Sequence, residues 1–182
     1  MTPKQAVMEN EFVITRLLEA PRDAVYRAWT EPERLKQWFG PKGFATFSSR
    51  LDLRPGGTYH YVMRGPDGKE MWGKWVFREI APRQRLVFVV SFSDKDLGVT
   101  RHPMNPNWPL ETLSTVLFED WAGKTLLTVR WAAGNAPRAE RQVFDSSHDS
   151  MRAGWGGTME RLVAYLKEPA PAGKTAFCAE SD

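Results

Sequence analysis

Changes in the spacing of hydrophobic residues divide the chain into regions of different structure. Residues 11–18 predict a strand with Phe12 and Ile14 turned inward. Pro21 then opens a short helix, because proline fits the first helical turn, where its missing N–H would have no partner. A second short helix is predicted from Glu31 to Gln37. Two short helices therefore follow the first strand.

From Gly43 onward the hydrophobic period becomes two, which is the spacing of strands. Strands are predicted at 47–53, 58–64, 70–80, 85–92, 110–119 and 124–131. The segment 85–92 is almost entirely apolar, as expected for a central strand buried on both faces. Residues 94–109 contain four Pro or Gly and show no periodicity. They predict a long loop, and loops of this length are often functional lids.

A helical period returns after Asn135-Ala136-Pro137 and predicts one helix from 138 to 166, about 40 Å long. Its apolar stripe is Phe144, His148, Met151, Trp155, Met159, Leu162 and Leu166. Gly154, Gly156 and Gly157 interrupt this pattern, and each costs about 1 kcal/mol relative to Ala. We interpret them as positions where another backbone approaches closely. The alternative is a kink that opens a cavity.

This order of elements predicts an α+β fold in one domain spanning residues 11–167. The sheet would be curved and antiparallel, with about six to seven strands, and would wrap around the long C-terminal helix. Residues 1–10 are predicted to be a flexible lead-in. Residues 168–182, which are small and polar, are predicted to be a disordered tail.

Composition and charge narrow the classes of function. The net charge is +3, and the basic residues are scattered rather than clustered, which does not favour nucleic-acid binding. No apolar segment is long enough to span a membrane or resembles a secretory signal, so we expect a cytoplasmic protein. The single cysteine, Cys178, cannot form an internal disulfide and reads as a free thiol.

Motifs for metal, cofactor or nucleophilic chemistry do not stand out. The three histidines lack the spacing of metal ligands, so we expect no metal. The chain has no nucleophile elbow and no phosphate-binding loop, so we expect no cofactor and do not favour an enzyme.

Four stretches of the sequence resemble a known family. They are FVITRLLEAPRDAVYRAWTEPERLKQWFGPKGF (12–44), LRPGGTYHYVMRGPDG (53–68), VVSFSD (89–94) and GWGGTMERLVAYL (154–166). Together they are similar to the START-like (SRPBCC) superfamily, and within it to the bacterial homologues of the Hsp90 ATPase activators. The resemblance covers about residues 11–167. It implies a helix-grip fold with an apolar cavity between the sheet and the C-terminal helix.

The resemblance also implies which residues bind a ligand. Trp38 and Phe39 would lie at the mouth of the cavity, and Trp155 would lie on its helical wall with Met151. Tyr59, Tyr61 and Met63, together with Trp72 or Trp75, would line the sheet side.

Histidines and loop charges are the candidates for chemistry. His148 lies on the apolar stripe of the long helix, where an imidazole could orient or protonate a ligand. The alternative is a neutral core histidine. His60 is predicted to face solvent. Asp94, Asp96, Arg101 and His102 could gate the cavity mouth, although solvated surface charges are the favoured interpretation.

Three functions fit the sequence. The first is binding of an apolar or amphipathic small molecule without a cofactor. The second is an enzyme of cyclase or dehydratase type that uses the same cavity, with His148 as acid or base. The third is regulation of a chaperone, which the resemblance suggests. However, the eukaryotic activators carry an additional N-terminal domain, and this chain is too short for both. A homodimer is possible.

Overall fold

A computed structural model describes residues 10–168 of the chain. The predictions for residues 1–9 and 169–182, including most of the lead-in, nearly all of the tail and Cys178, lie outside the described residues.

The N-terminal part has the predicted order of one strand and two short helices. Strand β1 (Phe12–Leu18) leads into α1 (Arg22–Thr30) and α2 (Pro32–Trp38). Pro21 occupies the N-cap of α1, and Pro32 lies in the first turn of α2, positions that need no N–H from the residue. The short helices bury Trp29 and Trp38 completely against the sheet.

All strands belong to one antiparallel sheet. The remaining strands are β2 (Ala45–Leu51), β3 (Thr58–Arg64), β4 (Glu70–Ala81), β5 (Arg85–Ser93), β6 (Val99–Thr100), β7 (Thr112–Trp121) and β8 (Lys124–Ala132). Their order is β1-β8-β7-β5-β4-β3-β2, so β1 returns to pair with β8, and the short β6 pairs with β5. The strand β6 lies inside the predicted long loop and raises the number of strands within residues 10–168 to 8.

The predicted single C-terminal helix is wrong, because it is divided at Ser147. Helix α3 (Arg138–Ser146) and helix α4 (His148–Lys167) meet at this residue, which has φ −98° and ψ 3°. The hydroxyls of Ser146 and Ser147 donate to the carbonyl of Val143, at 3.0 and 2.7 Å. Serine hydroxyls compete in this way with the helical ladder, which explains the break.

The glycines of α4 do not mark a close approach of another backbone, except weakly at one position. A β-carbon at Gly154 or Gly156 would meet nothing within 4 Å, and one at Gly157 would be in ordinary contact with Lys42. The helix continues through all three. Nothing in the structure explains Gly154 and Gly156.

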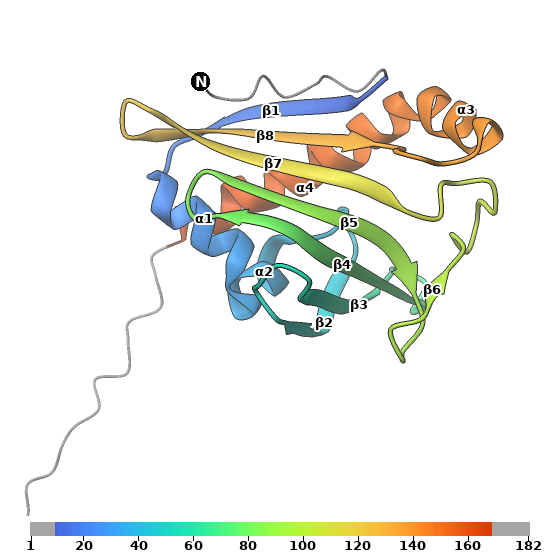
Figure 1. Ribbon diagram of the computed structural model, residues 1–182. Coiled ribbons are helices and arrows are strands. Elements are labelled where there is room, and N and C mark those ends of the chain that lie inside the picture. The colour runs from blue at the N-terminus through green and yellow to red at the C-terminus, as the bar shows by residue number, and fades with distance from the viewer. Residues whose placement is uncertain (1–9, 169–182) are drawn as a thin grey trace, which may run out of the picture.

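Within the described residues, the helices cover one face of the sheet, and the core lies between the helices and that face. Figure 1 shows α4 crossing that face, with α1 and α2 beside it. Strand β5 shows the consequence: Leu86 and Phe88 are buried on the covered face, whereas Val87 and Val89 are partly exposed on the other. The prediction that β5 is buried on both faces is therefore wrong.

Candidate functional site

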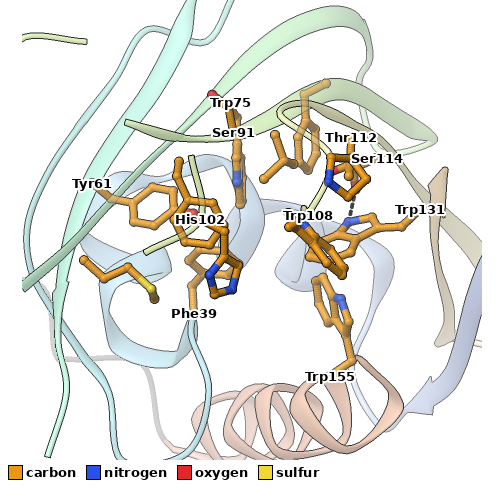
Figure 2. Close-up of a pocket in the computed structure, with 15 residues that line it drawn as sticks. Phe39, Tyr61, Trp75, Ser91, His102, Trp108, Thr112, Ser114, Trp131 and Trp155 are labelled. Carbon is orange, nitrogen blue, oxygen red and sulfur yellow. Dashed lines mark hydrogen bonds between the residues drawn. The ribbon is translucent and has the colours of Figure 1, made fainter. Parts of the chain in front are cut away.

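A cavity of about 240 Å³ lies between the covered face of the sheet and α4 (Figure 2). Its walls come from β3, β4, β5, β7, β8, α4 and the loops that follow α2 and β6. The lining residues are Phe39, Tyr61, Met71, Trp75, Phe88, Val90, Ser91, Phe92, His102, Trp108, Pro109, Thr112, Ser114, Trp131 and Trp155. Most of them are aromatic or aliphatic.

Aromatic rings that contact one another form most of the wall. Trp75 stacks on Phe88 with ring centroids 4.3 Å apart, and the edge of Phe39 lies against Trp75 at 4.9 Å. Across the cavity, Trp131 and Trp155 meet edge to face at 5.5 Å. Rings held by their neighbours in this way form a rigid surface, which is suited to a flat apolar molecule.

Phe39 reaches the cavity from the loop that follows α2, and α4 fixes that loop. The Nη1 of Arg161 donates to the carbonyls of Gly40, Pro41 and Phe44, at 3.0, 3.2 and 2.9 Å. One guanidinium thus satisfies three carbonyls of a loop, and the aromatic side chain beside them is held in place.

Hydroxyl groups provide part of the polar lining. Trp131 Nε1 donates to Ser114 Oγ at 2.9 Å, which orients the indole along the cavity wall. Thr112, which pairs with the inward-facing Val90, is also buried at the wall. The lining residues include no Asp, Glu, Lys or Arg among the described part of the chain.

His102 and Trp108 enter the cavity from residues 101–111, which we call the 101–111 loop. His102 Nδ1 accepts hydrogen bonds from the backbone N–H groups of Met104 and Asn105, at 3.0 and 3.2 Å. The imidazole packs on Phe92 with ring centroids 4.5 Å apart. Burial lowers the pKa of His102 below 6.5, so the ring is neutral at neutral pH.

Glu140, in the first turn of α3, ties both ends of the 101–111 loop to that helix. Its Oε1 accepts from Arg101 at 2.6 Å, and its Oε2 accepts from the backbone N–H of Leu110 at 3.4 Å. Arg101 also donates to the carbonyl of Trp108 at 3.4 Å. Glu140 is only 9% exposed, so these partners replace the hydrogen bonds that its carboxylate would make with water.

Four of the predicted ligand-binding residues line the cavity: Phe39, Tyr61, Trp75 and Trp155. Others lie in the core outside the cavity lining and are buried: Trp38, Tyr59, Met63 and Met151. Trp38 has its indole N–H engaged with the carbonyl of Ala28 at 3.0 Å.

Trp72 and His148 also lie away from the cavity. Trp72 is an odd number of residues from Trp75 on β4, so it lies on the opposite face, where its ring packs at 5.2 Å from His60. His148 lies between Phe12 and Phe144, at 5.7 and 5.5 Å. Its buried Nε2 has no hydrogen-bond partner within residues 10–168. His148 is thus half-buried between two phenylalanine rings, away from the cavity.

Sequence reasoning missed several lining residues, above all Trp108, Ser114 and Trp131. Trp131 and Ser114 could have been found from strand alternation, since both face inward on predicted strands. Trp108 lies in a loop without periodicity, and only the loop's length pointed to it.

An antiparallel sheet that wraps a C-terminal helix and encloses an apolar cavity defines a helix-grip domain of the START-like class. The chain belongs to the family described as "Activator of Hsp90 ATPase homolog 1-like protein", whose model matches residues 19–167.

Solved structures of bacterial proteins share this fold. A crystal structure from Nitrosomonas europaea is 27% identical, with a TM-score of 0.70, and the match covers 88% of this chain and 97% of that one. A solution structure from Arthrobacter aurescens is 26% identical, with a TM-score of 0.71 and coverage of 92% and 91%. A crystal structure from Mycobacterium smegmatis is 25% identical, with a TM-score of 0.68 and coverage of 88% and 93%. No curated protein matches the chain.

Two searches of residues 10–168 bear on other classes of function. None of their helices combines the length and apolarity that a membrane crossing requires. None of their His, Cys, Asp and Glu residues gather in threes that could hold a metal ion.

Proposed function

We propose that the protein binds a small, flat, predominantly apolar molecule in the cavity between the sheet and α4. The observation that carries this proposal is the cavity itself: about 240 Å³, lined by contacting aromatic rings and bearing a few hydroxyls and one neutral imidazole. Apolar walls with a small number of fixed polar groups are typical of small-molecule sites. The cytoplasmic location and the homodimer stay predictions.

The size of the cavity limits the ligand. Ligand sites usually measure about 300–1,000 Å³, and an engineered apolar cavity of about 150 Å³ holds benzene. The value of about 240 Å³ lies between them and favours a molecule of about two fused rings.

The lining favours binding over the other two functions. Acid–base catalysis usually pairs a proton donor with a proton acceptor. The titratable groups that line the cavity within the described residues are His102, whose Nδ1 lone pair is taken by the loop, and Tyr61, whose pKa is raised by burial. Regulation of a chaperone, which the family description suggests, would require a protein-binding surface and would leave the cavity unexplained. Small-molecule binding therefore explains the apolar lining and its few polar groups better than the other two functions do.

A titration followed by protein NMR tests the proposal. Naphthalene is the probe, and the indole N–H signals of Trp75, Trp108, Trp131 and Trp155 report on the cavity. The indole of Trp121, which is 59% exposed on β7, is the internal control. We expect saturable shifts at the cavity indoles and none at Trp121.

Two variants of neighbouring residues on β5 complete the test. Val90→Phe fills the cavity and should weaken naphthalene binding at least about tenfold, because the probe and the added ring compete for the same space. Val89→Phe adds the same ring on the outer face and should leave binding unchanged. Absence of saturable shifts in the wild type, or equal binding by Val90→Phe, would overturn the proposal.

A further inference from the structure

The 101–111 loop places a hydrogen-bond donor of fixed direction at the cavity. Building on the proposed function, we infer that the ligand presents an uncharged hydrogen-bond acceptor, such as a carbonyl oxygen or a pyridine-type nitrogen, to Nε2–H of His102. The site would then select among flat apolar molecules of similar size by the acceptor they carry at this end.

The tautomer of His102 follows from its backbone partners. Nδ1 faces two N–H groups, those of Met104 and Asn105, at 3.0 and 3.2 Å. Only a lone pair on Nδ1 can accept from them. A neutral imidazole carries one proton, so that proton is on Nε2.

Nε2 of His102 is available to a ligand. No atom of residues 10–168 accepts a hydrogen bond from it, and it is not among the buried atoms that lack a partner, so it reaches open space. Figure 2 shows the imidazole among the lining side chains, and its ring centroid lies 6.2 Å from that of Trp108. An acceptor on a bound molecule would satisfy this N–H.

The hydroxyl of Ser114 is a second hydrogen-bond donor at the cavity wall. Ser114 Oγ accepts from Trp131 Nε1, so the hydroxyl proton of Ser114 points away from that indole, and no atom of residues 10–168 accepts it. The hydroxyl of Ser114 can therefore act as a second donor beside the imidazole of His102.

The charge of the lining restricts the acceptor to an uncharged group. No Asp or Glu lines the cavity to pair with a cation, and no Lys or Arg to pair with an anion, among the described residues. An unpaired charge in such surroundings is costly. A neutral acceptor gains the hydrogen bond without this cost.

Quinoline and naphthalene form a matched pair of probes. They have the same shape and differ by one ring nitrogen in place of one C–H, and quinoline is uncharged at neutral pH. The measured quantity is the ratio of their dissociation constants, obtained from the cavity indole signals. Comparing this ratio between protein variants removes the difference in hydrophobicity between the probes.

Two substitutions of His102 distinguish the role of Nε2–H, the proposed donor to the ligand, from that of Nδ1, which holds the loop. In His102→Asn, the amide oxygen can take the place of Nδ1 and keep the bonds to Met104 and Asn105, but no donor occupies the place of Nε2. In His102→Gln, the longer amide places an N–H near the position of Nε2. We expect His102→Asn to lower the preference for quinoline about five- to tenfold, as for one hydrogen bond. His102→Gln should retain most of it.

The outcomes distinguish this inference from the proposed function. If naphthalene binds but the quinoline preference is the same in the wild type and in His102→Asn, the inference is overturned and the proposed function stands. If neither probe binds, both are overturned. Long-range ¹H–¹⁵N spectra of the imidazole give an independent readout: a proton on Nε2 is expected, and a proton on Nδ1 of the neutral ring would also overturn the inference.

Discussion

The phenol ring of Tyr61 lies over Gly73, its partner across β3 and β4, so closely that a β-carbon at Gly73 would be 2.5 Å from the hydroxyl oxygen. The absence of a side chain at Gly73 is what lets the ring lie on the sheet instead of in the cavity. Burial raises the pKa of Tyr61, so the phenol stays protonated. Aromatic rings that cover a cross-strand glycine also stabilise the pairing of the strands.

Gly73→Ala is therefore expected to push Tyr61 into the cavity. Overpacking of this kind costs about 1–3 kcal/mol of unfolding free energy, and naphthalene binding should weaken in parallel. Urea unfolding and the NMR titration measure the two effects. In a Tyr61→Leu background the same substitution should cost less, because the ring that it meets is gone. An equal cost in both backgrounds would contradict this explanation.

Glycine-to-alanine substitution should stabilise the protein at the two α4 glycines that have free space around them. Gly154→Ala and Gly156→Ala should each stabilise the protein by about 0.5–1 kcal/mol, since alanine favours the helix and a β-carbon meets nothing within 4 Å. Thermal or urea unfolding measures the gain. Gly40→Ala is the contrasting control: φ is +119° there, and we expect destabilisation. Loss of stability at Gly154 and Gly156 would show that these positions have a role of their own.

Replacing Glu140 tests how α3 holds the 101–111 loop. Glu140→Gln removes the charge that Arg101 contacts and weakens the bond from the N–H of Leu110. We expect the amide of Leu110 to exchange with solvent several-fold faster, whereas amides of β5 keep their protection. Glu119→Gln, on an exposed site of β7, should change neither. Unchanged exchange at Leu110 would mean that other contacts hold the loop.

Stability should fall on acidification because of His102. Its folded-state pKa is lowered, by burial first, below the unfolded value of 6.5, so the unfolded chain binds more protons in the window below 6.5. The stabilisation is complete above 6.5 and is lost progressively as the pH falls toward the folded-state pKa. Urea unfolding from about pH 7.5 to about pH 5 should show a steeper loss in the wild type than in His102→Asn. Parallel curves would argue against a neutral, buried imidazole.

The elements were predictable from the sequence wherever local periodicity is strong, and the break in the last helix was not. Strand alternation and turn residues correctly predicted the strands on either side of Gly65-Pro66-Asp67-Gly68. The break at Ser147 was missed because the apolar stripe continues through it, with Phe144 before and Met151 after. Two serine hydroxyls that bond one carbonyl leave no mark on hydrophobic spacing.

The cavity was only partly predictable, for two different reasons. Alternation puts Trp72 and Trp75 on opposite faces of β4, but the face that the helices cover is decided by packing across the sheet. His102 and Trp108 lie in a loop, where position depends on the contacts of Arg101 and Glu140, far apart in the chain. The family resemblance predicted a cavity between the sheet and the C-terminal helix, but it did not predict the contacts of Arg101 and Glu140 that position the loop.

Substitutions in different parts of the cavity wall differ in how much they endanger folding. Its aromatic floor, with Trp75 and Phe88, is also the hydrophobic core, so changing the floor endangers folding. The imidazole that we propose contacts the ligand comes instead from the 101–111 loop, and surface loops vary in sequence more readily than the sheet. Descendants of one such chain could acquire new molecular preferences by exchanging a short surface segment while inheriting the same stable scaffold.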